Sequence, residues 1–309
     1  EEQRLRALAL AERLRLPELQ GALRAATGDG SPELARRARV ALAAAEGGPS
    51  HALVIRSFGG LEVSRDGEPV PRAAWRGEMA RRLLCRLLVA EGRAVSREEL
   101  MADLWPAARE EAARANLRVS LTRLQAAIDP GRPAGAAGWF VRAEGDALRL
   151  DLERIAAWDV HRFDRAIRAG LAAERAGDAA AAVAHYGEAL ACYEGPLLPE
   201  VRGEDWALGL CARLSHAFQE TGLRCGELLL AAGRSDDAGD LAARLLREDP
   251  ADEDAVALRM RAQLARNEHA RALRTFETAR RNLRRLLDVE PGEGLLALAE
   301  QARRPAPRA

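Results

Sequence analysis

The most informative segment of the chain runs from Glu98 to Ile128. It opens with Glu98-Glu99-Leu100-Met101-Ala102-Asp103-Leu104-Trp105-Pro106 and closes with Ala115-Asn116-Leu117-Arg118-Val119-Ser120-Leu121-Thr122-Arg123-Leu124-Gln125-Ala126-Ala127-Ile128. The first part predicts a short amphipathic helix that ends at Trp105-Pro106, because proline interrupts a helix. The second part predicts a longer helix with an apolar stripe at Leu117, Leu121, Leu124 and Ile128. Two helices with a sharp join and a polar face on the second form the arrangement that reads a DNA groove.

The polar face of the second helix has the chemistry for contacts with bases. With Leu121 placed at the core and a step of about 100° per residue, the polar and small residues fall on the far side and its flank. Arg suits guanine, Asn suits adenine, and Thr or Val suits a thymine methyl group. The competing interpretation is an ordinary solvated face, since every basic residue of the chain is arginine. The candidate base-reading residues are Asn116, Arg118, Val119, Thr122 and Arg123.

The flanking segments favour the DNA-reading interpretation. Residues 51–71 show strand spacing with a turn at Asp66-Gly67, residues 76–91 predict a helix, and Ser96 to Glu99 form a capping box. Residues 139–151 predict a hairpin. Strands, three helices and a hairpin form a winged helix with an added N-terminal sheet, which we expect over residues 51–152. Backbone contacts with DNA would come from arginines at the helix starts and in the hairpin, namely Arg76, Arg81, Arg97 and Arg142.

Residues 157–303 predict an all-α domain with an internal repeat. Gly177, Gly233 and Asn267 each precede a small residue by five positions and a packing position by nine. The last two copies are 34 residues apart, which is the tetratricopeptide period. A long helix around residues 204–232 separates the first copy from the second. The fold class is therefore mainly α, with a winged helix-turn-helix (α+β) followed by tetratricopeptide-like helices.

Composition excludes several kinds of chemistry. The 309 residues include no lysine, so a Schiff-base mechanism and a lysine-containing phosphate loop are both excluded. The five histidines are scattered without metal-ligand spacing, and none of the four cysteines belongs to a C-x-x-C pair. We therefore expect no enzyme activity, no catalytic or metal site and no cofactor. The formal net charge of +0 gives no support to a nucleic-acid partner, although residues 51–150 are mildly basic.

The N-terminal segment carries no visible chemistry. Residues 1–48 predict short helices that suit the end of an upstream helical-repeat domain. No signal peptide and no apolar run of membrane-spanning length occurs in the sequence. We therefore expect a cytoplasmic protein without a membrane partner.

The residues together resemble a known bacterial family. Residues 53–151 resemble the OmpR-type winged helix, through Arg81 to Leu88, Val95 to Leu100, Leu104-Trp105-Pro106, Ala113 to Arg118 and Leu121 to Leu124. Residues 158–302 resemble the bacterial transcriptional activator domain, through Asp159, Phe163, Tyr193 to Leu197, Trp206, Asp249-Pro250, Glu253 and Ala272 to Leu286 followed by Pro291. Both parts together are similar to the core of a Streptomyces antibiotic regulatory protein (SARP). Departures from the family pattern are Trp139-Phe140, Gln125 and Phe276.

The resemblance implies a sequence-specific regulator. Its expected partners are double-stranded DNA with direct repeats near a promoter, RNA polymerase through its sigma factor, and further copies of the chain on DNA. An alternative is a protein-interaction scaffold without DNA binding, in which the repeats hold a partner and the winged helix is a docking module. The near-neutral charge keeps this alternative open.

Overall fold

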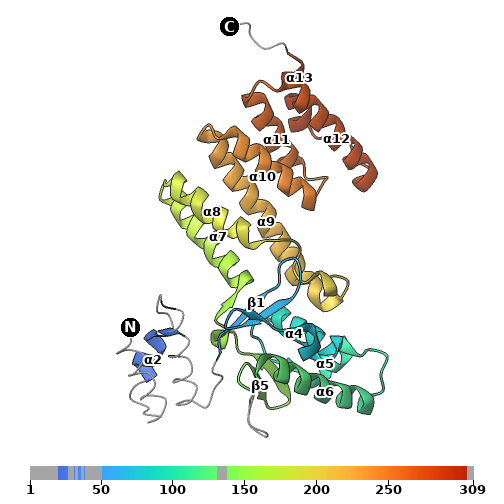
Figure 1. Ribbon diagram of the computed structural model, residues 1–309. Helices are drawn as coiled ribbons and strands as arrows, with labels where there is room; N and C mark the ends of the chain where they lie inside the picture. Colours follow the sequence, from blue (N-terminus) through green and yellow to red (C-terminus); the bar gives the residue numbers. More distant parts are fainter. Residues whose placement is uncertain are drawn as a thin grey trace. The chain divides into compact units, whose positions relative to one another are not determined.

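The chain forms two compact units, which are described separately. The computed structural model describes residues 20–26, 31, 34–35, 38, 51–130 and 138–304 (Figure 1). One unit holds the chain up to Asp159 together with Leu197–Cys211, and the other holds Val160–Pro196 and the residues from Ala212 onward. Helix α2 (Gln20–Ala26) belongs to the expected N-terminal helical segment. The remainder of that segment, apart from four residues, and the loop at 131–137 lie outside the described residues.

The first unit begins with a four-stranded sheet in the order β3-β2-β1-β7. Strands β1 and β2 pair in antiparallel fashion within the β element that the sequence predicts. The predicted turn at Asp66 and Gly67 joins β2 to β3, with φ values of 50° and 88°. Leu53 and Ile55 are fully buried, because alternate residues of a strand point to the same face of the sheet. Strand β7 pairs in parallel with β1, about a hundred residues further along the chain. The strands are β1 (Leu53–Arg56), β2 (Glu62–Arg65), β3 (Glu68–Pro69) and β7 (Ala157–Trp158).

The sheet is followed by three helices and a hairpin, which form a winged helix. A second sheet in the order β4-β6-β5 sets the hairpin against a short strand before α5. The fully buried Leu83, Leu84, Leu87 and Leu88 of α4 form the core stripe expected from the sequence. The elements are η2 (Arg72–Trp75), α4 (Glu78–Val89), β4 (Val95–Ser96), α5 (Arg97–Leu104), α6 (Glu110–Ile128), β5 (Val141–Glu144), β6 (Ala147–Leu150) and η3 (Leu152–Arg154).

Buried polar contacts fasten the ends of the first unit together. The Asp159 carboxylate accepts hydrogen bonds from Ser57 N at 2.7 Å, Ser57 Oγ at 2.8 Å and Phe58 N at 2.9 Å. The indole of Trp158 donates to Ser57 Oγ at 2.9 Å. Because unpaired buried polar groups are costly, these bonds fix the strand end against the start of the next helix.

Residues 197–211 also belong to the first unit, although they lie far along the chain. Leu197 forms an isolated bridge with Phe58, and Glu200 accepts a hydrogen bond from Leu61 N at 2.8 Å. Glu204 pairs with Arg82 of α4 at 2.5 Å. The short helix η4 (Pro199–Val201) lies in this segment. The winged helix thus gains contacts from a stretch that the sequence analysis assigned to the second domain.

The second unit is helical and shows the predicted repeat. Gly177, Gly233 and Asn267 all adopt the left-handed conformation, with φ values of 77°, 74° and 57°. After each, the next residue donates its N–H to a carbonyl five residues earlier, as in Asp178 N to Ala173 O, which is a Schellman helix end. The helices are α7 (Asp159–Arg175), α8 (Ala179–Cys192), α9 (Asp205–Ala231, of which the part from Ala212 onward belongs to this unit), α10 (Ser235–Glu248), α11 (Glu253–Ala265), α12 (His269–Leu287) and α13 (Glu293–Arg303).

Small residues at fixed positions after these turns allow the helices to pack closely. Ala182, Ala238 and Ala272, each five residues after its turn, are fully buried. The residues four further on, Tyr186, Ala242 and Phe276, are at most 2% exposed. The sequence repeat therefore corresponds to a structural repeat, and α9 is the predicted interrupting helix. Within the described residues, no helix has the length and apolar character that crossing a membrane requires.

Candidate nucleic-acid interface

Helix α5 has a well-defined beginning and end. Ser96 Oγ accepts a hydrogen bond from Glu99 N at 3.0 Å, and the acidic Glu98 and Glu99 lie in the first turn, where they complement the helix dipole. The helix ends at Leu104, and Trp105 leaves it with φ −139°. The predicted N-cap at Ser96 and the predicted stop at Trp105-Pro106 are both confirmed. The Glu99 carboxylate, which would complete the expected capping box, pairs with Arg86 instead.

A buried arginine holds α5 against α4. Arg86 is 5% exposed, and its guanidinium pairs with Asp103 at 2.6 Å and with Glu99. The guanidinium also lies 5.7 Å from the ring centroid of Trp206. The sequence analysis missed this residue. Its signal was a single charge inside the apolar run from Leu83 to Leu88.

Helix α6 has one buried and one exposed face. The buried face packs in the core of the first unit through Ala113, Leu117, Ser120, Leu124, Ala127 and Ile128. All five candidate base-reading residues are exposed: Asn116, Arg118, Val119, Thr122 and Arg123. Val119 is 46% exposed, so its methyl groups are open to a partner. The spacing of Asn116, Val119 and Arg123 places them on a single line along the helix.

The expectation that Leu121 is a core residue is wrong in part. Leu121 is only half-buried, and the more fully buried neighbour is Ser120, at 4% exposure. The buried face is rotated toward Leu117, Ser120 and Leu124, and Leu121 instead lines a cleft next to α5. A pure apolar-stripe rule cannot detect this rotation, because the serine gives no apolar signal.

Arg123 and Arg76 lie close to the start of α4. A side chain at Gly77 would come within 3.1 Å of the Arg123 guanidinium, so Arg123 lies against the backbone of the α4 N-terminus. Arg76 precedes this glycine and adopts a left-handed conformation with φ 50°. Arg76 and Arg123 are both exposed. The fold therefore brings one base-reading candidate and one backbone-contacting candidate together.

Arg118 and Arg97 line a cleft between α5, α6 and the turn of the hairpin. Its volume is about 890 Å³, and it also includes Arg114, Leu121 and Asp146. Arg97 pairs with Asp146 at 3.6 Å. Arg118 is thus at the flank of the α6 face, toward the hairpin, rather than in line with Asn116 and Val119.

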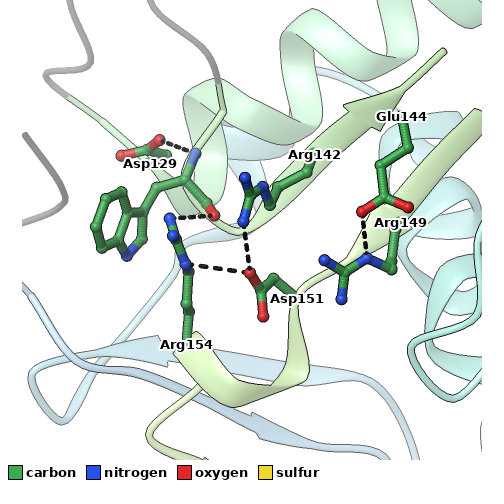
Figure 2. A network of polar contacts seen from close by, with 7 residues as sticks. Asp129, Arg142, Glu144, Arg149, Asp151 and Arg154 are labelled. Atoms are coloured by element: carbon green, nitrogen blue, oxygen red, sulfur yellow. Dashed lines mark hydrogen bonds and ion pairs between the residues drawn. The ribbon is translucent and has the colours of Figure 1, made fainter.

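The hairpin carries a network of arginines and carboxylates (Figure 2). Asp151, only 5% exposed, pairs with Arg142 of β5 at 3.5 Å and with Arg154 at 3.1 Å. Arg149 of β6 donates to Glu144 at 2.7 Å across the hairpin. The Arg142 side chain remains 46% exposed, so it combines an internal partner with access to solvent.

The base of the hairpin is fixed by an aromatic contact. The Arg154 guanidinium lies 3.7 Å from the ring centroid of Trp139, and Trp139 N donates to Asp129 at 3.2 Å. Phe140 is buried at 1% exposure and lies 5.6 Å from His51, ring centroid to ring centroid. The hairpin is therefore anchored to the end of α6.

Comparison with known proteins agrees with this architecture. Residues 158–303 match the bacterial transcriptional activator domain. The chain carries a bacterial transcriptional activator domain. The winged helix precedes this domain, so the chain is similar to a SARP-like protein in its domain order. No curated protein sequence matches the SARP-like chain significantly.

One of the similar solved structures shares the fold. EmbR of Mycobacterium tuberculosis, solved in complex with a low-affinity phosphopeptide, matches with a TM-score of 0.67 and 24% identity. The match covers 82% of the SARP-like chain and 65% of the EmbR chain, so this chain spans about two thirds of the EmbR length. The TPR2B domain of yeast Sti1, in a complex labelled pHsp70, matches with a TM-score of 0.34 and 18% identity over 46% of this chain and 96% of its own.

Arg81 has a different environment from the other backbone-contacting candidates of the SARP-like chain. Its side chain is 19% exposed, and it donates to Leu61 O at 2.9 Å and pairs with Glu200 at 3.5 Å. It also lies 5.6 Å from the ring centroid of Trp75. These contacts hold the Arg81 side chain within the first unit, in contrast to the exposed Arg76.

The departures from the family pattern are accommodated without disturbing the fold. The amide of Gln125 lies so close to Gly138 that a Cβ there would be 2.5 Å from Gln125 Nε2. Trp139 and Phe140 pack as described above, and Phe276 is buried at 2% exposure. Gln125 therefore faces the start of the hairpin and contacts its backbone.

The described residues offer little for chemistry of other kinds. Within them, no group of three His, Cys, Asp or Glu side chains is arranged to hold a metal ion. Burial raises the pKa of the Cys85 thiol to about 12 and that of the Cys225 thiol to about 11. Neither thiol is ionised at neutral pH, so neither is an activated nucleophile.

Proposed function

We propose that the chain is a DNA-binding transcriptional regulator that reads promoter sequence with α6. The observation that carries this proposal is the exposed line of Asn116, Val119 and Arg123 on a helix whose opposite face is buried. A recognition helix needs such a rigid, outward polar face in order to enter a major groove.

Each side chain of the face has a suitable base partner. Arg123 can donate two hydrogen bonds to guanine O6 and N7, and Asn116 can pair with adenine N6 and N7. Val119 and Thr122 suit a thymine methyl group. The Thr122 hydroxyl already donates to Arg118 O at 2.9 Å, which leaves its methyl and its lone pairs for the partner.

Contacts with the DNA backbone would come from Arg76, Arg97 and Arg142. They position the domain without reading sequence. Arg97 and Arg142 have carboxylate partners at 3.6 and 3.5 Å, so phosphates would compete with Asp146 and Asp151 for them. Such binding weakens with salt, because each phosphate contact releases counterions.

The remaining partners follow from the SARP-like architecture. We propose binding to direct repeats near a promoter, head-to-tail association of copies on DNA, and activation through contact with RNA polymerase and its sigma factor. This activity would take place in the cytoplasm. The helical repeats of the second unit supply surfaces for protein contacts.

An electrophoretic titration with promoter-containing genomic fragments tests the proposal. We expect salt-sensitive binding to a subset of fragments and two footprints in direct repeat. Absence of salt-sensitive binding at any fragment would contradict the proposal, and a palindromic footprint would contradict head-to-tail association.

A scaffold without DNA binding remains the second candidate. The observation that favours it is the pairing of the hairpin arginines Arg142 and Arg149 with carboxylates, in a chain of zero formal net charge. Retention of RNA polymerase by the immobilised chain, with no retention on DNA, would support this candidate over the first.

A further inference from the structure

A groove in the second unit runs between α11 and α12, beside the end of α10. Its volume is about 700 Å³. Arg259 and Gln263 of α11 line one side, and Arg271, Arg274 and Asn282 of α12 line the other. We propose that this α11–α12 groove binds an extended acidic peptide segment of a partner protein. This proposal concerns a surface separate from α6, and it does not depend on DNA binding.

The charges of the groove are of one sign. All three charged residues that line it are arginines: Arg259, Arg271 and Arg274. Arg271 pairs with Glu268 at 3.1 Å, whereas Arg259 and Arg274 have no carboxylate partner within the described part of the chain. Arg259 is half-buried at the edge of the groove. A carboxylate supplied by a ligand would restore charge-assisted hydrogen bonds there.

The floor of the groove is apolar. Val256 and Ala279, at 2% and 3% exposure, belong to the hydrophobic core of the last helices, and Leu246 and Pro250 complete the floor. Apolar side chains of a peptide can pack on such a floor. A nucleic-acid backbone has no equivalent group, and residues 151–309 contain more Asp and Glu than Arg, which disfavours DNA on this unit.

Side-chain amides in the groove suit a peptide backbone. Thr275 donates to Gln263 Oε1 at 3.0 Å, and Asn282 donates to Pro250 O at 3.2 Å. These bonds hold the two amides in place while each keeps further hydrogen-bonding capacity. Held amides at both ends of a groove can pair with the N–H and C=O groups of an extended chain.

The length of the groove sets the size of the ligand. From Arg271 to Asn282 the helix rises about 16 Å. An extended chain covers about 3.3 Å per residue, so about five residues fit. Alternate residues of such a chain point the same way. Two carboxylates on alternate residues can therefore face the arginines while the residues between them face the floor.

The test uses the full chain and a fluorescein-labelled decapeptide in which Glu alternates with Leu. Anisotropy titrations should show saturable binding that weakens strongly in about 1 M salt. A matched peptide with Gln in place of every Glu should bind at least tenfold more weakly. No saturation up to about 1 mM, or equal binding of the two peptides, would overturn the proposal.

A pair of variants locates the binding. Arg259→Gln with Arg274→Gln should weaken binding of the Glu peptide about ten- to a hundredfold, because two charge-assisted contacts are lost. Arg285→Gln is the control, since this exposed α12 residue is not among those lining the groove. Unchanged circular dichroism should accompany both variants. Equal peptide binding by the double variant would place the peptide elsewhere and would overturn the proposal. Displacement of the peptide by non-specific duplex DNA would indicate a nucleic-acid ligand and would also overturn it.

Discussion

Different kinds of contact stabilise the interior of each of the two units. In the first unit, single polar side chains join segments that are far apart in the sequence, such as Asp159 with Ser57 and Arg86 with Trp206. In the second unit, equivalent turns at Gly177, Gly233 and Asn267 set up a repeat in which small residues let neighbouring helices pack. Polar contacts between distant segments are therefore prominent in the first unit, whereas repeated close packing is prominent in the second.

This difference matters for function. A domain that reads bases must hold its recognition helix rigidly, and Arg86 fixes α5 against α4 just before α6. A stack of repeated helices needs only local packing, and it leaves long grooves such as the one between α11 and α12 open to partners.

Removal of the Arg86 side chain should destabilise the first unit most. Arg86→Ala leaves Asp103 and Glu99 without their partner, and we expect the free energy of unfolding to fall by about 2–4 kcal/mol. The loss is limited to this range because both carboxylates still reach solvent. Urea unfolding followed by tryptophan fluorescence measures this loss. The control is Arg82→Ala on the same helix, where a partly exposed pair with Glu204 is worth about 0.5 kcal/mol. Equal effects of the two substitutions would contradict the role of Arg86.

In the second unit, the sensitive positions should be those of close packing. A Cβ at Gly170 would be 2.4 Å from a ring carbon of Tyr186, and the ring is held by a 2.6 Å bond from its hydroxyl to Glu174. Gly170→Ala should therefore lower the free energy of unfolding by about 1–3 kcal/mol, which thermal unfolding measures. Gly187→Ala, with nothing within 4 Å, should instead stabilise the helix by about 0.5–1 kcal/mol. Similar shifts for both variants would show that packing at Gly170 is not tight.

Loss of a base contact should weaken specific DNA binding while stability is kept. Arg123→Ala and Asn116→Ala should each weaken the free energy of binding to the preferred DNA site by about 1–3 kcal/mol, since each removes a bidentate contact with a base. Titration of a bound fragment with each variant measures this change. Ala126→Ser, on the exposed side of the same helix, is a mild control. If the variants bind as tightly as the unchanged chain, α6 does not read bases through these residues.

The smallest and most uniform effect should come from the hairpin. Arg142→Ala should weaken binding to all DNA sequences alike and lower the slope of log K against log salt by about one. Measurements of binding at several salt concentrations give this slope. A change in sequence preference without a change in slope would assign Arg142 to base reading.

Much of the fold could be predicted, because its signals are local. The capping box at Ser96, the stop at Trp105-Pro106 and the hairpin turn at Gly145 are each encoded within a few residues. The repeat could be read from three short motifs, since each turn needs a left-handed residue followed by a small one.

The remainder depends on contacts between distant residues. Nothing near Ser57 indicates that Asp159 will accept its hydrogen bonds, and nothing near Arg81 indicates that Glu200 will pair with it. Contacts between distant residues also return residues 197–211 to the first unit. They likewise set the rotation of α6 that leaves Leu121 half-exposed. For the candidate site, the sequence identified residues that are exposed, but it did not distinguish the internally paired Arg81 from Arg76.

Selection of binding sites from random DNA tests the central claim most directly. The unchanged chain and the Asn116→Ala and Arg123→Ala variants would each be used to select sequences, which are then compared base by base. We predict a directly repeated half-site for the unchanged chain, and loss of preference at one or two bases of each half-site for each variant. Identical preferences for all three proteins, or no enriched sequence for the unchanged chain, would contradict reading by α6.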